Sequence, residues 1–94
     1  VVRARPIGVL LMEDESGMDE KILCAPHHKL TPFYDDILDY SDVQKPLIMR
    51  ITHFFEHYKD LEPHKWVKVE GWGDAARARE LILEAIEREK TGKA

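Results

Sequence analysis

The strongest constraint on the fold is an apolar stripe with helical spacing that lies between Pro46 and Pro63. Apolar residues at every third or fourth position share one face of an α-helix. Proline is tolerated in the first turn of a helix, and it also marks the region just past a helix end. The pattern therefore predicts an amphipathic helix over residues 46–61, with an apolar face made of Leu47, Ile48, Ile51, Phe54, Phe55, Tyr58 and Leu61.

The segment before this helix has the two-residue alternation of strands. In residues 1–12, apolar and charged side chains alternate at first, and an apolar run follows. This pattern predicts a strand in which Pro6 marks an edge or a bulge. An acidic stretch, residues 13–20, contains turn residues, and residues 21–25 are typical of a returning strand. The first quarter of the chain is therefore predicted to form a β-hairpin.

The remaining segments complete the predicted order of elements. Residues 26–45 carry two prolines, adjacent histidines and several aspartates, which indicates a long loop with one short helical turn. Residues 64–70 alternate as a strand, and Asp74 can cap a final helix over residues 75–90. The order strand, strand, helix, strand, helix predicts an α+β fold.

Composition narrows the class of protein. The 94 residues include 14 Lys and Arg against 18 Asp and Glu, a net charge of −4, which argues against a general nucleic-acid binder. No apolar run approaches the roughly 18 residues of a membrane span, and no signal-peptide pattern opens the chain. The single cysteine, Cys24, cannot form an internal disulfide, so we expect a cytoplasmic protein in which Cys24 is a small buried side chain.

The acidic stretch is the first candidate site. Asp14 and Asp19 are expected on opposite arms of the turn, and Lys21 is expected on the same strand face as Asp19. Carboxylates are the hard oxygen ligands that suit Mg²⁺ or Mn²⁺, and a nearby ammonium can bind a phosphate group. The alternative is a solvated acidic turn that holds no metal. The stretch concentrates five carboxylates in eight positions, namely Glu13, Asp14, Glu15, Asp19 and Glu20.

A second candidate pair, Tyr58 and Lys59, closes the predicted helix. A phenol and an ammonium together can bind an anionic oxygen. Lys59 is also explained by a favourable position near a helix C-terminus, and Tyr58 by a place in the apolar core. These alternatives remain open at this point.

Two further patterns are attributed to structure. His53 and His57 match the spacing H-x-x-E-H of a zinc motif, but no third ligand is indicated, so we reject zinc. We expect them inside the protein or at a subunit contact, where protonation near about pH 6 would weaken assembly. Trp66 and Trp72 are expected to be packing residues.

The longest motifs resemble the soluble family I inorganic pyrophosphatases. They are residues 53–62 (HFFEHYKDLE), 65–72 (KWVKVEGW), 5–10 (RPIGVL) and 12–17 (MEDESG), with Asp19 and Lys21 in the same register. The resemblance implies part of a small OB-like β-barrel flanked by helices, hexameric assembly, and hydrolysis of pyrophosphate to two phosphates with Mg²⁺ or Mn²⁺. It also implies that Asp14 and Asp19 bind metal, and that Lys21, Tyr58 and Lys59 bind phosphate.

The family pattern is only half present. The Asp-Gly-Asp-Pro-x-x-Asp motif, which holds the presumed water-activating aspartate, does not occur in the 94 residues. We therefore expect residues 1–94 to be the C-terminal portion of a single pyrophosphatase domain, inactive without the N-terminal portion. The alternative is a non-catalytic fragment that binds metal or phosphate or serves in oligomer assembly.

Overall fold

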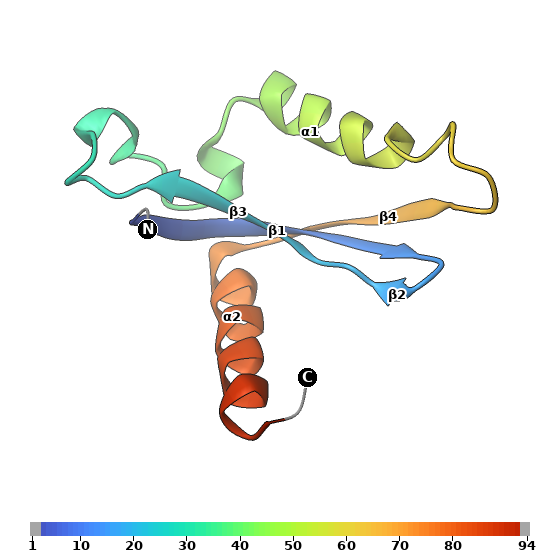
Figure 1. Cartoon of the computed structure of the whole chain (residues 1–94). Coiled ribbons are helices and arrows are strands. Elements are labelled where there is room, and N and C mark those ends of the chain that lie inside the picture. Colours follow the sequence, from blue (N-terminus) through green and yellow to red (C-terminus); the bar gives the residue numbers. More distant parts are fainter. Residues whose placement is uncertain (1–2, 93–94) are drawn as a thin grey trace.

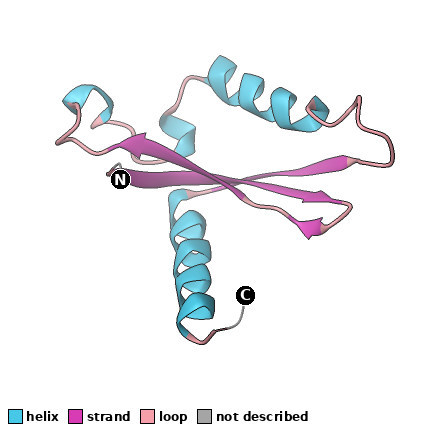
Figure 2. Cartoon of the chain, viewed as in Figure 1, coloured by secondary structure: helices cyan, strands magenta, loops and turns pink. Residues whose placement is uncertain are grey.

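The structure, a computed structural model, describes residues 3–92. Its strands form one antiparallel sheet, and its two α-helices lie on opposite sides of that sheet (Figures 1 and 2). The strands are β1 (Ala4–Asp14), β2 (Gly17–Met18), β3 (Lys21–Pro26) and β4 (Val67–Gly73), and the helices are α1 (Lys45–His57) and α2 (Ala75–Lys90). The predicted α+β order is confirmed, with β2 as an added short strand inside the acidic turn; the predicted first two residues of β1 lie outside the described residues.

Strand β1 is the centre of the sheet. It pairs with β3 along one edge, from Ala4 opposite Pro26 to Leu10 opposite Lys21. Along its other edge it pairs with β4, from Val9 opposite Gly73 onward. A register shift between Pro6 and Gly8 is the bulge that the proline indicated. Because β1 has neighbours on both edges, it also carries most of the core.

The core is small. The largest fully buried side chains are Val9, Leu10 and Met12, all from β1. Helix α2 adds Ala75 and Ala78, whose small side chains allow the helix to lie close to β1. Cys24 is exposed, so the prediction of a buried thiol is wrong: among the described residues β3 is an edge strand, and the long loop and α1 leave an open groove over this side chain.

Helix α1 is shorter than predicted. It ends at His57 because turns take over, in which the Asp60 amide donates to the His57 carbonyl and the Glu62 amide to the Lys59 carbonyl. The stripe is also less buried than predicted, since Leu47 is 50% and Leu61 98% exposed. Thus only part of the apolar face of α1 packs against the rest of this chain.

Trp72 connects both α1 and the long loop to the sheet. Trp72 of β4 donates its indole N–H to the Thr52 hydroxyl of α1 at 3.0 Å, and its ring stacks on Tyr40 at a centroid distance of 5.4 Å. Tyr40 begins the second of two short 3₁₀ helices, Pro32–Tyr34 and Tyr40–Asp42, in the long loop. The packing role predicted for Trp72 is confirmed, whereas Trp66 lies just before β4 and is 47% exposed.

The other two predicted elements differ little from those observed. Strand β4 begins and ends three residues later than predicted, at Val67 and Gly73. Helix α2 has the predicted bounds, and the Asp74 carboxylate accepts from the Arg77 amide at 2.8 Å. Neither α1 nor α2 is long and apolar enough to cross a membrane.

Candidate functional site

The acidic turn is folded tightly against β1. Asp14 ends β1 opposite Gly17, and the Ser16 amide donates to Asp14 Oδ1 at 2.8 Å. Gly17 has φ of +117°, a conformation that favours glycine and lets the chain reverse after two residues. The Asp19 amide then donates to the Met12 carbonyl at 2.9 Å, which returns the chain beside β1. Asp14 and Asp19 therefore lie on the two arms of the turn, as predicted.

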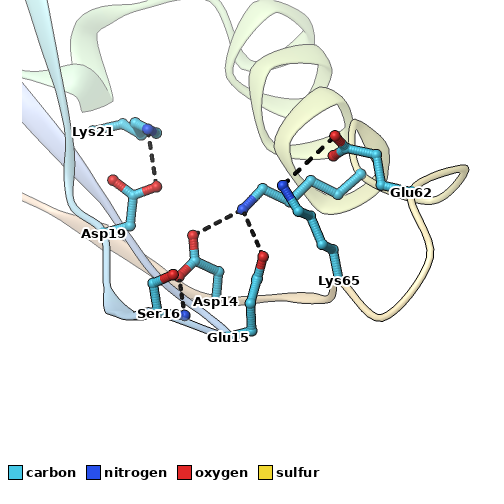
Figure 3. A network of polar contacts seen from close by, with 8 residues as sticks. Asp14, Glu15, Ser16, Asp19, Lys21, Glu62 and Lys65 are labelled. Carbon is cyan, nitrogen blue, oxygen red and sulfur yellow. Dashed lines mark hydrogen bonds and ion pairs between the residues drawn. The ribbon is translucent and has the colours of Figure 1, made fainter.

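Lys59 reaches this turn from the end of α1. Its Nζ lies 2.9 Å from Asp14 Oδ2 and 3.5 Å from Glu15 Oε1. The side chains of Lys59 and Asp14 are only 14% and 10% exposed, so the contact is largely shielded from water. Figure 3 shows the carboxylates of Asp14 and Glu15 on the same side of the turn. Two segments 45 residues apart thus meet in one ion pair.

Each partner of this contact stabilises the charged form of the other. The hydrogen bond from Lys59 lowers the pKa of Asp14 below its usual value, and the Ser16 amide lowers it further. The hydrogen bond to Asp14 in turn raises the pKa of Lys59. At neutral pH the carboxylate is therefore ionised and the lysine is protonated.

Asp19 and Lys21 form a second pair beside the first. The Lys21 Nζ lies 2.9 Å from Asp19 Oδ2, and the two side chains are about one-third exposed (Figure 3). The same Nζ lies 5.9 Å from the centroid of the Phe55 ring of α1. Lys21 is therefore held between a carboxylate and an aromatic ring at the rim of the site.

Tyr58 lies at the surface rather than in the core. It is 38% exposed, and its ring lies 5.6 Å from the Lys59 Nζ. The alternative of a buried core tyrosine is therefore wrong for the described chain. The predicted site residues fall into two groups. Lys59 contacts both Asp14 and the ring of Tyr58, and Lys21 forms an ion pair with Asp19.

The carboxylates of the site are of the right chemical type to bind a divalent cation, but too few of them lie close together. Asp14, Glu15 and Asp19 offer the hard oxygen atoms that Mg²⁺ prefers. Among residues 3–92, however, no three histidine, cysteine or acidic side chains gather closely enough to hold a metal ion. The described residues can therefore supply only part of a metal centre.

Two residues of the site were given no role by the sequence. Glu15 is a second acceptor for Lys59, and Phe55 lies next to Lys21. Glu15 stood out only as one of several adjacent carboxylates, and Phe55 only as part of the apolar stripe. No local pattern links either residue to its partner, because both contacts depend on where α1 lies over the sheet.

The two histidines of α1 are exposed. Their rings are 4.5 Å apart, and His57 Nδ1 lies 2.8 Å from Asp60 Oδ2. The expectation of interior histidines is therefore wrong within this chain, because this face of α1 points away from the sheet. A role for His53 and His57 at a subunit contact stays a prediction.

Comparison with known proteins shows which family this chain resembles. A sequence model of the inorganic pyrophosphatase family matches residues 1–90. The inorganic pyrophosphatase of Agrobacterium fabrum is 57% identical over 97% of this chain and 51% of its own length. That of Saccharolobus solfataricus is 50% identical over 98% of this chain and 54% of its own length. The chain thus spans about half the length of the curated relatives it matches.

Solved structures agree in fold as well as sequence. The inorganic pyrophosphatase of Helicobacter pylori matches with a TM-score of 0.92 and 47% identity over 95% of this chain and 52% of its own. That of Thermus thermophilus matches with a TM-score of 0.88 and 43% identity over 95% and 51%. These matches confirm the expected α+β portion of an OB-like barrel flanked by helices. Sequence and structure lead to the same conclusion: the chain belongs to the inorganic pyrophosphatase family.

Proposed function

We propose that residues 1–94 are the C-terminal portion of a single pyrophosphatase domain, which in the full-length protein hydrolyses inorganic pyrophosphate to two phosphates. The observation that carries the proposal is the Asp14–Lys59 contact next to the Asp19–Lys21 pair, in a chain of this family. Carboxylates and ammonium groups at one end of a sheet are what a metal-assisted phosphoryl transfer needs. The full-length protein is therefore an inorganic diphosphatase.

The site residues divide by charge. Asp14 and Asp19 would contribute ligands to Mg²⁺, or to Mn²⁺, and further ligands would come from outside these 94 residues. When bound, such a cation lowers the pKa of a coordinated water and offsets phosphate charge. Lys21, Tyr58 and Lys59 would contact the phosphate oxygens.

The side chains of this chain would bind the phosphate groups and orient the metal-binding carboxylate. The ammonium groups of Lys59 and Lys21 counter the charge of the phosphate groups, and the Tyr58 hydroxyl can donate a hydrogen bond to them. Asp14 is kept ionised and fixed in direction by Lys59 and by the Ser16 amide. No residue of this chain is proposed as the water-activating aspartate, and we propose that this group belongs to the N-terminal portion.

The cellular location, assembly and partners of the full-length protein are also proposed. We place it in the cytoplasm as a homo-oligomer, a hexamer by family resemblance, without nucleic-acid or membrane partners. A net charge of −4 and exposed apolar residues on α1 support these proposals. We favour the enzyme over a non-catalytic metal-binding or assembly module because the quoted relatives are all named as the enzyme.

The test is phosphate release from pyrophosphate by the full-length protein in Mg²⁺. We expect Lys59→Met to lower kcat about a hundredfold, because removal of one group that stabilises transition-state charge has an effect of this size. Asp19→Asn is expected to raise the Mg²⁺ concentration needed for half-maximal rate. Asp36→Asn, at an exposed aspartate outside the site, is the matched control. Unchanged turnover in Lys59→Met together with an unchanged Mg²⁺ requirement in Asp19→Asn would overturn the proposed site.

A further inference from the structure

The ring of Phe55 in α1 contacts one residue from each of the two groups that form the charged site. The Lys21 Nζ lies 5.9 Å from the centroid of this ring. The ring of Tyr58 packs against it at a centroid distance of 5.5 Å. Lys21 belongs to β3 and Tyr58 follows the end of α1, so a single aromatic side chain links a residue of the sheet to one beyond the helix.

The orientation of the Phe55 ring is set by its neighbours. Phe54 and Tyr58 pack against it at interplanar angles of 84° and 80°, the edge-to-face arrangement that aromatic pairs favour. Thr52 lies three residues earlier on the same face of α1, and it accepts the indole N–H of Trp72 from the sheet. The half-buried ring is therefore held both within α1 and against the sheet, and it can in turn hold a flexible side chain.

The ion pair of Lys21 does not hold its ammonium in one position. A lysine side chain is a flexible four-carbon stem, and the pair with Asp19 leaves 37% of this one exposed. Exposed ion pairs fix such a stem weakly, because water competes for both charges. The stem also lines a cavity of about 300 Å³, together with Ile51, Phe55 and Trp72, which leaves it room to turn away from the site.

An aromatic face is suited to holding a lysine that binds an anion. The ring attracts the ammonium through its quadrupole but carries no net charge, so it does not repel a phosphate group as a second carboxylate would. It also leaves ammonium N–H groups available to oxygen acceptors. Phe55 therefore differs from Asp19, whose carboxylate competes with phosphate for the same ammonium.

We propose that Phe55 is a positioning residue for phosphate binding, which acts by holding the Lys21 ammonium beside Tyr58. The inference rests on the proposed function, in which Lys21 and Tyr58 contact phosphate oxygens. The Phe55 ring does not itself touch the substrate. Loss of the ring would leave every proposed phosphate-binding group present but the ammonium less well placed, so it should weaken substrate binding more than it slows the chemical step.

Substitution by leucine in the full-length protein tests this role. Phe55→Leu keeps an apolar side chain and removes the aromatic face, and Phe33→Leu makes the same change at a ring of the long loop that is 83% exposed. We expect Phe55→Leu to raise both KM for pyrophosphate and Kd for inorganic phosphate by about threefold, with kcat changed by less than about twofold. Phe33→Leu should change none of the three.

A ring-preserving variant separates positioning from a merely structural role. Phe55→Tyr keeps the aromatic face, so it should retain the wild-type KM and Kd. Circular dichroism of the variants checks that α1 is retained. A fall in kcat at constant KM in Phe55→Leu, or equal effects of Phe55→Leu and Phe55→Tyr, would overturn the proposal.

A double-mutant cycle shows whether Phe55 acts through Lys21. Lys21→Met removes the ammonium that the ring holds, so adding Phe55→Leu to that variant should change Kd for inorganic phosphate by less than about 1.5-fold. An effect as large as in the wild-type background would mean that the ring does not act through Lys21, which contradicts the proposal.

Phosphate binding and hydrolysis distinguish this proposal from the proposed function. If the full-length protein binds inorganic phosphate more weakly in Phe55→Leu but the wild type does not hydrolyse pyrophosphate, the function fails and the role of Phe55 stands. If the wild type hydrolyses pyrophosphate but Phe55→Leu behaves like Phe33→Leu, the role of Phe55 fails and the function stands. A wild type that binds no phosphate would overturn both.

Discussion

The Asp14–Lys59 pair links the ionisation of the site to the stability of the chain. The two charges are shielded by the turn on one side and the end of α1 on the other, with side-chain exposures of 10% and 14%. When Lys59 is removed, Asp14 loses the counterion that offsets its shielding from water. When Asp14 is removed, Lys59 keeps only the longer contact of 3.5 Å with Glu15. The Lys65–Glu62 pair, at 3.8 Å and about half exposed, lacks this shielding and serves as a comparison.

The lowered pKa of Asp14 gives the pair a defined pH dependence. Its stabilising effect is full above the unfolded pKa of about 3.9 and is lost as pH falls through the lower folded pKa. For Lys59, whose pKa is raised, the effect is full below about pH 10.4 and is lost as pH rises through the folded pKa. We expect Asp14→Asn to lower the free energy of unfolding at pH 7 and to reduce its loss between about pH 4 and pH 2.

Urea unfolding between pH 2 and pH 7 measures the free energy of unfolding of the wild type and of Asp14→Asn. Asp36→Asn, at an exposed aspartate, should retain the acid dependence of the wild type. Lys65→Met should change the free energy of unfolding by less than about 1 kcal/mol, as is typical of exposed ion pairs. An identical acid dependence in wild type and Asp14→Asn would show that Lys59 does not hold Asp14 in its ionised form.

At the scale of elements, α2 depends on a residue far from it in sequence. Asp39 Oδ1 accepts from the Ala75 amide at 2.7 Å, while Asp74 accepts from the Arg77 amide. The first turn of α2 thus has two carboxylate caps, one of them from the long loop. The hydrogen bond from Ala75 also lowers the pKa of Asp39, because it favours the ionised form.

We expect Asp39→Ala to lower the free energy of unfolding by about 1 kcal/mol, since the loss of a helix N-cap usually has this effect. The Ser41 hydroxyl, which donates to Asp39 Oδ2 at 2.8 Å, would lose its acceptor as well. Asp36→Ala in the same loop is the control. Chemical denaturation of the two variants measures the difference, and equal stability would mean that Asp74 alone suffices to cap α2.

Local patterns predicted the elements better than the site. Helix α2 could be predicted to the residue because its N-cap, Asp74, and its periodicity are local. The end of α1 could not, because the turns after His57 compete with a helical continuation of the same apolar stripe. That early end has a consequence, since Lys59 lies beyond the helix and extends to Asp14. The pairing of residues 45 positions apart depends on the packing of α1 on the sheet, which no short motif encodes.

At the scale of the whole molecule, one strand holds the fold together. Leu10 lies in β1, is paired on both sides and is 1% exposed. We expect Leu10→Ala to lower the free energy of unfolding by about 2–5 kcal/mol, because it removes buried methyl groups and leaves a cavity. Leu61→Ala, at 98% exposure, should change it by less than about 0.5 kcal/mol. Thermal unfolding of both variants tests this, and similar effects would contradict a core centred on β1.

The exposure of the α1 stripe also belongs to this scale. The predicted face is only partly confirmed: Ile48, Ile51 and Phe55 are half-buried, whereas Leu61 lies beyond the end of α1. A sequence pattern does not say whether the partner of an apolar face is in the same chain. Leu47 and Phe54 remain 50% and 58% exposed, and Cys24 is open to solvent on β3. The prediction of a buried Cys24 was wrong for the same reason, because a strand pattern does not say what covers the face of the strand.

The central position of β1 also sets the order in which the chain can assemble during synthesis. The β1–β3 hairpin can close once Pro26 has left the ribosome, because its partners are near in sequence. The other edge of β1 must wait for Gly73, and the ion pair at Asp14 must wait for Lys59. Contacts between distant residues form late because more chain must be ordered to make them. The nascent hairpin therefore contains the Asp19–Lys21 pair but leaves Asp14 without its partner until Lys59 has been made, so the candidate site is completed only after α1.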